Sequence, residues 1–391
     1  MELDLLDGNL YIDTPYSTYA WMREHQPVYW DGVNELWGIF RYDHIEHIER
    51  RSDIFISSDQ AKGGYRPNLP ADPAIIGLDD PEHRERRNLV ARRFTPHGVA
   101  GWEEEVRATV TRLLDAVEAK GGRAEIVGDL AAPLPATIIG RLLGFEPEQF
   151  SALEHWSART IALGGGPRYL VEDGIVAAME FAQASSDLHA EKLRCPADDV
   201  MSLWTHAEWH GCPLPLESVI ADSLLLLDGG AETTRTVIAR ALLSFVEHPD
   251  QWRLLRDGTD LEIATEELIR YVTPIHNMCR VATQDVEIGG QTVRAGQQVV
   301  LMYGSANRDP AHFTDPDRLD LTRYPNRHLA FGFGTHFCLG ASLARLEIRV
   351  FLEELTQRVR ALRLAPGFAV EEMPNAFVYG LRAAHLDFDF E

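Results

Sequence analysis

The sequence predicts a mainly helical protein with a minor β region, organised as one domain over residues 1–391. Helical hydrophobic periodicity recurs along most of the chain, whereas Val/Ile-rich runs typical of strands occur in only two places. No internal repeat or low-complexity linker divides the sequence. With 45 % hydrophobic and 25 % charged residues, the composition is that of a globular protein whose core is large enough to enclose a cofactor.

Seven segments have the pattern of amphipathic or buried helices: 101–120, 129–144, 147–163, 174–194, 217–248, 261–272 and 341–360. The first of them ends at a clear stop signal, Gly121-Gly122. Strands are expected within 28–40 and 280–303. Two Gly- and Pro-rich stretches, 59–80 and 163–168, are expected to be long loops, which are either flexible connections or lids over a site.

The charge pattern limits the partners and the location that we expect. Lys and Arg total 37 against 60 acidic residues, and this net charge of −23 disfavours binding to nucleic acid or anionic lipid. The N-terminus is acidic and lacks a signal-peptide pattern, and the most apolar run, 224–227, is far shorter than a membrane span. We therefore expect a cytoplasmic protein with no membrane insertion. The four cysteines show no CxxC pairing, so neither a disulfide framework nor a zinc site is expected.

One cysteine lies in a Gly- and Phe-rich loop directly before a predicted helix. Residues 331–340 read FGFGTHFCLG, and the glycines permit a tight loop and a close approach of the backbone to a flat ligand. Because Cys338 lies just before a helix N-terminus, the helix dipole and free N–H groups favour its thiolate form, which binds metals. Phe331, Phe333 and Phe337 are expected to exclude water from the sulfur. The alternative is a Gly-rich turn beside a buried, inert cysteine.

At every specified position this segment resembles FGxGxHxCxG, the haem-binding signature of the cytochrome P-450 superfamily. The resemblance implies a mainly α fold shaped like a triangular prism, with a minor β region. It implies haem b between the long central helix and the helix after the cysteine loop, with Cys338 as axial ligand and with Phe331 and Gly340 in contact with the cofactor. It also implies oxygen activation, and hence a haem-thiolate monooxygenase.

A second motif lies in the predicted helix 261–272. Glu267 and Arg270 stand i, i+3 on one face, a spacing that pairs side chains but that taken alone is typical of a solvated surface salt bridge. The pair resembles the superfamily's ExxR motif, in which a later arginine completes a buried structural triad. Pro316-Asp317-Arg318 occupies that later position, so the resemblance assigns Arg318 as the third member, anchoring the cysteine loop.

Four further side chains match the superfamily's contacts to the haem propionates. His83 and Arg87, four apart on one face of a predicted helix, match the HxxxR arrangement. Arg280, at the start of a strand region, and His336, in the cysteine loop, match two more contacts. Each of them taken singly is more simply a structural or solvated side chain, and only their convergence on one ligand favours the assignment.

The middle of the longest predicted helix contains two adjacent glycines, which a helix interior disfavours. Gly229 and Gly230 let a flat cofactor and dioxygen approach the backbone; the alternative is a break between two shorter helices. The segment resembles the oxygen-activation motif [AG]Gx[DE]T of the superfamily, which makes Glu232 the acid and Thr233 the alcohol of a proton relay.

The substrate is indicated by residues outside these motifs. The stretches 63–67, 277–280 and 305–307, with Gly229-Gly230, look like an actinobacterial branch that hydroxylates the terminal methyl of cholesterol or cholestenone side chains. The predicted pocket residues are apolar, which suits a steroid but equally a terpenoid, fatty acid or polyketide: Ile75, Ile76, Leu226, Ile275 and Met278. Asp228 replaces an apolar residue of the relatives, and if it faces the pocket it counts against this substrate.

The resemblance also implies external electron donors, because the chain has no flavin-binding or iron–sulfur segment. A ferredoxin or flavodoxin with its NAD(P)H reductase is expected, together with dioxygen and a lipophilic small molecule. In an otherwise acidic chain, an arginine cluster is the predicted docking surface: Arg84, Arg86, Arg92 and Arg93. Two other functions stay open, a peroxide-driven haem-thiolate enzyme, against which Glu232 and Thr233 argue, and a non-catalytic haem sensor.

Overall fold

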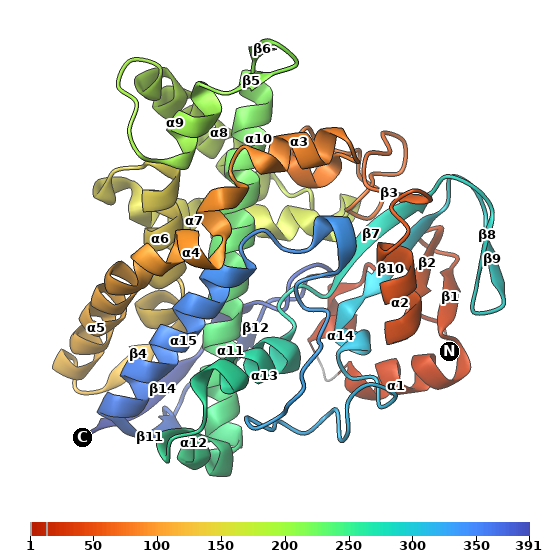
Figure 1. Cartoon of the computed structure of the whole chain (residues 1–391). Helices are drawn as coiled ribbons and strands as arrows, with labels where there is room; N and C mark the ends of the chain where they lie inside the picture. Colours follow the sequence, from red (N-terminus) through yellow and green to blue (C-terminus); the bar gives the residue numbers. More distant parts are fainter. Residues whose placement is uncertain (1, 13–14) are drawn as a thin grey trace.

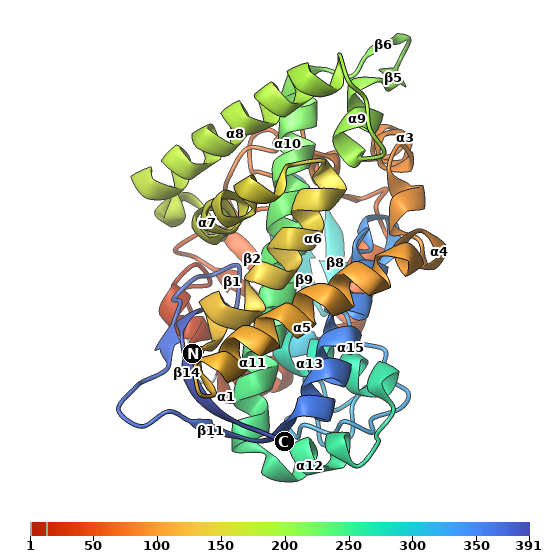
Figure 2. The same ribbon diagram turned by 90° about the vertical axis from the view of Figure 1, so that its left-hand side faces the viewer.

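A helical column runs through the middle of the molecule in the computed structural model, which describes residues 2–12 and 15–391 (Figure 1). The column consists of α10 (Leu216–Leu227) and α11 (Thr233–Glu247), joined end to end. Three further helices pack beside it and on one another: α5 (Glu103–Ala119), α6 (Pro133–Leu143) and α15 (Ala341–Arg358). Figure 2 shows α5 and α6 lying across the column. The largest cluster of buried apolar side chains lies among these helices.

Ten more helices surround this core. Helices α7, α8 and α9 lie toward the end of the column where α10 begins, and α12 lies at the end where α11 stops (Figures 1 and 2). The bounds are α1 (Tyr16–His25), α2 (Tyr42–Glu49), α3 (Glu82–Asn88), α4 (Pro96–Val99), α7 (Phe150–Thr160), α8 (Glu172–Lys192), α9 (Val200–Thr205), α12 (Pro249–Arg256), α13 (Leu261–Val272) and α14 (Tyr303–Ala306). The seven predicted helices are all present; the sequence patterns did not predict α1, α2, α9 and α12.

The column is not broken at its two glycines. Between α10 and α11 a π-helical turn, Asp228–Glu232, continues the helix, so the alternative of two separate helices is wrong. Single π-helical turns inside α-helices are frequent at functional sites. A side chain at Gly230 would collide with Ile139 of α6, whereas a Cβ on Gly229 would meet no described atom within 4 Å. The turn is thus packed on one face and open on the other.

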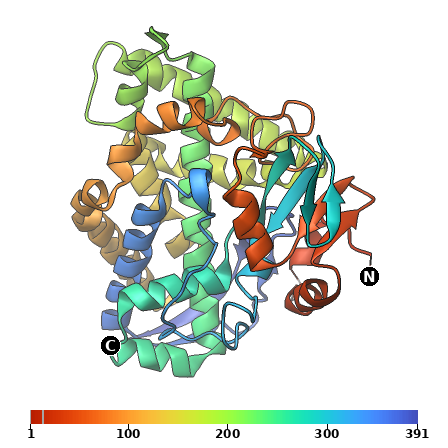
Figure 3. The same ribbon diagram turned by 45° about the vertical axis from the view of Figure 1, so that its right-hand side comes forward.

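The minor β region is chiefly a five-stranded sheet at one edge of the molecule, where Figure 3 shows red and cyan strands side by side. Its order is β1-β2-β10-β7-β3, and only the β2–β10 pair is parallel. The bounds are β1 (Val28–Asp31), β2 (Leu36–Ile39), β3 (Phe55–Ile56), β7 (Asn277–Ala282) and β10 (Gln298–Met302). The two predicted strand regions are therefore parts of one sheet. Because side chains alternate along a strand, Met278 and Arg280 of β7 share one face, opposite Cys279.

The C-terminal part of the chain adds a second sheet that was not predicted. Its order is β11-β14-β4, from β11 (Val359–Leu364), β14 (His385–Phe390) and β4 (Arg123–Glu125). Three two-stranded ribbons complete the β structure: β5 (Glu208–Trp209) with β6 (Cys212–Pro213), β8 (Val286–Ile288) with β9 (Gln291–Val293), and β12 (Glu371–Glu372) with β13 (Leu381–Ala383). Across residues 2–12 and 15–391, no helix combines the length and the apolar character needed to cross a membrane.

Candidate active site

A cavity of about 400 Å³ lies between the helical column and the N-terminal end of α15. Gly229 and Thr233 line it from the column, and Cys338 and Gly340 line it from the cysteine loop. The two sequence motifs predicted to enclose a flat cofactor are thus brought together around one cavity. All five residues predicted for the substrate pocket also line it: Ile75, Ile76, Leu226, Ile275 and Met278.

The cysteine loop is a tight turn that places Cys338 on the cavity wall. The Cys338 N–H donates to the carbonyl oxygen of Phe331 at 2.9 Å. Gly334 has a φ of +70°, a left-handed conformation that favours glycine. Burial raises the pKa of the Cys338 thiol, and the N–H groups of Gly340 and Ala341 only partly oppose this. Burial and the helix N-terminus thus act on the thiol in opposite directions, and binding of a metal ion would favour the thiolate.

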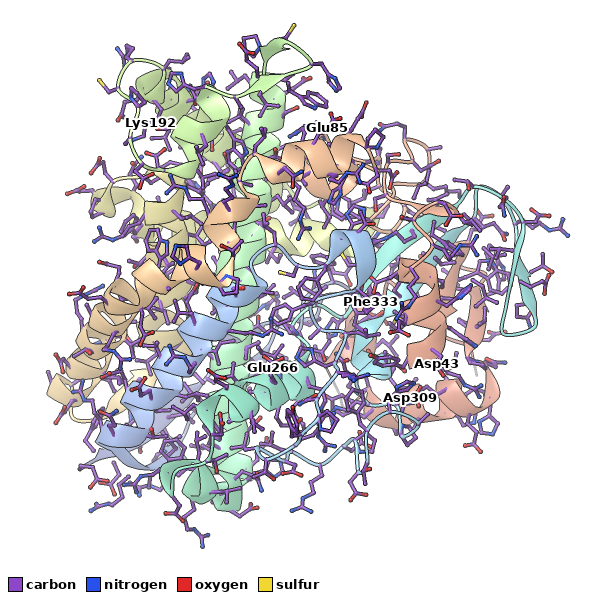
Figure 4. All side chains as sticks on the ribbon, viewed as in Figure 1. Asp43, Glu85, Lys192, Glu266, Asp309 and Phe333 are labelled. Carbon is purple, nitrogen blue, oxygen red and sulfur yellow. The ribbon has the colours of Figure 1, made fainter. Side chains whose placement is uncertain are left out.

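Of the three phenylalanines predicted to shield the sulfur, only Phe331 lines the cavity. The ring of Phe333 packs under the guanidinium of Arg50, 4.5 Å from it, and Figure 4 shows Phe333 on the loop near α2. Phe337 is 40 % exposed. Phe333 and Phe337 therefore do not line the cavity, although the Phe337 ring lies 6.2 Å from that of Phe331, and Leu339 and Leu343 line it beside Phe331. Whether the three rings keep water from the sulfur stays a prediction.

The four residues predicted to bind propionates lie at the same cavity. His83, Arg87, Arg280 and His336 all line it, and the rings of the two histidines are 4.2 Å apart. Burial lowers the pKa of His336 to about 2, and the nearby Arg280, His83 and Arg87 lower it further. Arg280 Nη2 lies 3.6 Å from Oε1 of Glu49, whose own pKa burial raises to about 7. This buried corner therefore favours an anionic ligand.

The residues around the cavity fit a haem group. A thiol lines one wall, and cationic side chains gather at one corner, where two carboxylates would be neutralised. Added Cβ atoms on Gly229 and Gly340 would meet no described atom within 4 Å, so both backbones leave room for a flat ring. The donor set is that of a thiolate-ligated haem iron rather than of a multidentate metal site, since the described residues contain no group of three His, Cys, Asp or Glu suited to a metal ion.

The two residues of the predicted proton relay differ in position. Thr233 lines the cavity, and its Oγ1 donates to the carbonyl oxygen of Gly229 at 2.7 Å. Glu232 is 2 % exposed and does not line the cavity. Its Oε1 accepts from Ser157 of α7 at 3.0 Å, and its Oε2 lies 2.9 Å from Nη2 of Arg235. Only Thr233 can therefore contact a ligand in the cavity directly.

The buried triad contains Arg323, and the assignment of Arg318 was wrong. Glu267 and Arg270 are completely buried, and Glu267 Oε2 lies 2.7 Å from Arg270 Nε and 3.0 Å from Arg323 Nε. Arg318 is exposed and offers only its backbone carbonyl to Arg270 and Arg323. The reason is local. Each arginine ends a backbone turn, in which the N–H of Arg318 or Arg323 donates to a carbonyl oxygen three residues earlier, and the turn that ends at Arg323 directs the Arg323 guanidinium toward α13. Asn326 also donates to Glu267, so the triad holds the segment before the cysteine loop.

The predicted docking cluster is smaller than expected. Arg86 is 1 % exposed and forms a buried ion pair with Asp222 of α10, which also accepts from the N–H of Ile75 at 2.6 Å. Arg93 pairs with Asp198. Arg84 and Arg92 are exposed and have no ion-pair partner among the described residues. Including Arg86 was wrong, because the face of α3 that carries it packs against the column; in Figure 4, Glu85 marks the exposed face of α3.

Polar side chains that the sequence did not assign to the pocket also line the cavity. Tyr65 donates to Asp72 Oδ2 at 2.5 Å, and Arg66 Nη2 lies 3.0 Å from the same oxygen. Asp228 lines the cavity too, and Thr160 of α7 donates to its Oδ1 at 2.6 Å. Two sequence features pointed to these positions: the Gly63–Pro67 stretch, and Asp228 in place of the apolar residue of the relatives. Neither feature shows where a side chain points.

Comparisons with known proteins agree with this geometry. The sequence model of the cytochrome P450 family matches residues 176–366. A steroid C26-monooxygenase of Mycobacterium tuberculosis is 38 % identical over 98 % of this chain and 96 % of its own, and a linalool 8-monooxygenase of Pseudomonas putida is 32 % identical over 92 % and 93 %. The crystal structure of CYP109E1 from Bacillus megaterium in complex with testosterone superposes with a TM-score of 0.88, at 32 % identity, over 97 % of this chain and 99 % of that one. The predicted fold is thereby confirmed.

Proposed function

This chain belongs to the cytochrome P450 family and is a monooxygenase, and from that premise we propose that it hydroxylates the terminal side-chain carbon of a steroid such as cholesterol or cholest-4-en-3-one. The similarity to a steroid C26-monooxygenase over nearly the whole chain carries the proposal. The aliphatic side chains Ile75, Ile275 and Met278 on the cavity wall support it, because burial of apolar area gives a sterol its affinity.

We propose haem b as the form of the cofactor, because the chain has no CxxCH sequence for covalent attachment. When bound, the haem iron supplies the activation of dioxygen. Cys338 would bind its iron, Arg87 and Arg280 would neutralise its propionates, and His83 and His336 would donate hydrogen bonds to them. Gly229, Gly230 and Gly340 keep the backbone close to the ring, and Phe331 covers the sulfur side.

In this proposal, the hydroxyl of Thr233 is the proton donor at the cavity wall. Its hydroxyl is bonded to the Gly229 carbonyl and can turn toward a ligand without disturbing the helix. Glu232 acts through its position behind Thr233. Burial raises the pKa of Glu232, while Arg235 and Ser157 oppose this shift. A peroxide-driven enzyme would have no need of this pair.

Replacing Thr233 by Ala is expected to uncouple electron consumption from product formation. Haem ligation and substrate affinity should stay within about twofold of the wild type, because neither depends on this hydroxyl. Product per reducing equivalent should fall about 100-fold, the lower end of the range expected for a proton-transfer group, and hydrogen peroxide should rise. Thr233→Ser is the matched control and should keep most of the coupling. Wild-type coupling in Thr233→Ala would transfer the role to Thr234 or to an ordered water.

We further propose that a ferredoxin or flavodoxin, reduced by its NAD(P)H reductase, docks near the exposed Arg84 and Arg92. The protein is otherwise acidic, so these cations form a local positive surface on the side of α3 and the cysteine loop. Charge reversal of both residues is expected to slow reduction by ferredoxin about tenfold at low salt, and high salt should abolish the difference because exposed charges are screened. Reversal of Arg86 would test folding instead, since Arg86 is buried. Equal rates for wild type and the Arg84/Arg92 variant at low salt would place docking elsewhere.

Titration of the haem-loaded protein with cholest-4-en-3-one tests the steroid proposal. Binding should change the spin state of the haem, and turnover with a ferredoxin system should give a product hydroxylated at the terminal side-chain carbon. A terpenoid is the second candidate, favoured by the similarity to a linalool 8-monooxygenase and by the carboxyl of Asp228 in the cavity. Binding of linalool without binding of the steroid would decide for it.

A further inference from the structure

Asp228 is a carboxylic acid on the wall of a largely aliphatic part of the cavity. The lining from α10 and from the loop 59–80 combines aliphatic side chains with the polar Tyr65, Arg66, Asp72 and Asp222, and the aliphatic ones are Ile75, Ile76, Leu224, Leu225 and Leu226. Burial of a carboxyl among aliphatic groups costs free energy unless its oxygens are hydrogen-bonded. An acid at this position therefore needs either a partner in the protein or one in the ligand.

The π-helical turn is what brings Asp228 to the cavity. In an α-helix, residues five apart point about 140° away from one another, so Asp228 would face the surrounding protein when Thr233 faces the cavity. A π-helical turn pairs residue i with i+5 and brings the two to the same side. Both residues do line the cavity, and five residues of rise separate them by about 7 Å along the helix axis. The carboxyl thus lies within about one helical turn of the proposed proton donor.

One oxygen of Asp228 has a partner in the protein and the other has none among the described residues. Oδ1 accepts from Thr160 at 2.6 Å. The cation Arg66 lines the same cavity, but its guanidinium pairs with Asp72. Burial raises the pKa of Asp228 well above its usual range; Thr160 opposes the shift and Glu232 adds to it. Burial therefore favours the protonated carboxyl, against the opposing effects of Thr160 and Arg66, and the protonated form has one O–H that can donate to a ligand.

We propose that Asp228 is a specificity-determining residue that donates a hydrogen bond to a hydroxyl or carbonyl oxygen of the substrate, a few bonds from the carbon that is oxidised. The inference rests on the proposed monooxygenase function. It narrows the substrate class to lipophiles that already carry an oxygen near the oxidised carbon, so a side-chain-oxygenated steroid should be preferred over cholest-4-en-3-one. The preferred lipophiles carry an oxygen near their reacting end. A bare hydrocarbon end would leave the O–H of Asp228 unpaired in a dry site, and sites built to bind a substrate oxygen reject analogues that lack it.

The test compares two matched ligand pairs on the haem-loaded protein by the spin-state change on binding, which needs no turnover. The steroid pair is 25-hydroxycholest-4-en-3-one and cholest-4-en-3-one, and the terpene pair is linalool and the hydrocarbon myrcene. In the wild type, the oxygenated member of at least one pair should bind about tenfold more tightly, or better. Asp228→Leu should abolish this preference, and Asp228→Asn, which keeps an N–H donor, should restore most of it.

Asp72→Asn is the control variant, because Asp72 lines the same cavity but already accepts from Tyr65 and Arg66. It should leave the ratio of the two dissociation constants unchanged. If neither steroid binds and linalool is preferred over myrcene only when Asp228 is present, the steroid proposal is wrong and this inference holds. No preference in either pair, absence of binding included, or a preference that persists in Asp228→Leu, overturns the inference.

Discussion

Cys338→Ala is expected to lose the red-shifted Soret band that marks a thiolate-ligated ferrous–carbonyl complex, together with all measurable hydroxylation. Cys338 is the only cysteine among the described residues that lines the cavity, so no neighbouring sulfur can replace it. The loss should exceed the 10–100-fold typical of residues that merely support a metal ligand. The measurement is the spectrum of the carbonyl complex at equal haem content, followed by product analysis.

Cys195→Ala provides the control for this substitution. Cys195 is exposed, and its removal should change neither the spectrum nor turnover. Persistence of the red-shifted band in Cys338→Ala would contradict the assignment of the axial ligand. It would also leave the similarity of the loop to the haem-binding signature without a physical explanation.

The second large effect is expected from a matched pair of substitutions, Arg323→Leu and Arg318→Leu. Removal of Arg323 leaves the completely buried Glu267 with one cation fewer, and breaking a buried ion pair in this way typically costs about 3–5 kcal/mol. Arg318 is exposed, so its loss should change stability by no more than about 0.5 kcal/mol. Urea unfolding midpoints of the two variants, compared with the wild type, measure the difference.

Haem retention gives this experiment a second readout. The triad and Asn326 hold the segment that leads into the cysteine loop, so Arg323→Leu should release haem at a lower urea concentration than Arg318→Leu. Equal midpoints for the two variants would contradict the position of Arg323 in the triad and return the role to Arg318.

The parts of the site that the sequence predicted are those written as short motifs. The loop around Cys338, the glycines of the central helix and the His83–Arg87 pair each match a motif of the superfamily, so the resemblance assigned them to one site, and all of them line one cavity. The same holds for the long helices, whose periodicity extends over several turns. The steroid relatives and the matching fold agree with the resemblance that these motifs carried.

The failures lie where a side chain's direction depends on distant contacts. Arg318 was assigned from its place in Pro316-Asp317-Arg318, and no pattern in this irregular segment shows that the guanidinium of Arg323 reaches Glu267 instead. Periodicity of α3 did not show that Arg86 faces inward, because its partner Asp222 is more than a hundred residues away. The orientation of Asp228 could not be predicted because a π-helical turn changes the direction in which the following side chains point, whereas the sequence pattern assumes a regular α-helix. The second sheet was missed because its short strands pair across more than two hundred residues.

The buried ion pair between Arg86 and Asp222 also affects where the cavity can open to admit a substrate. Asp222 holds both Arg86 and the backbone of Ile75, so an opening at Ile75 would leave a buried charge unpaired. The corner between α7 and α8, where Ile161 and Gly164 line the cavity, is held by exposed pairs such as Arg159 with Asp173, each worth 1 kcal/mol or less. From this difference in ion pairing we expect substrates to enter past the α7–α8 corner. Disulfide closure of that corner should slow association while leaving the bound complex unchanged.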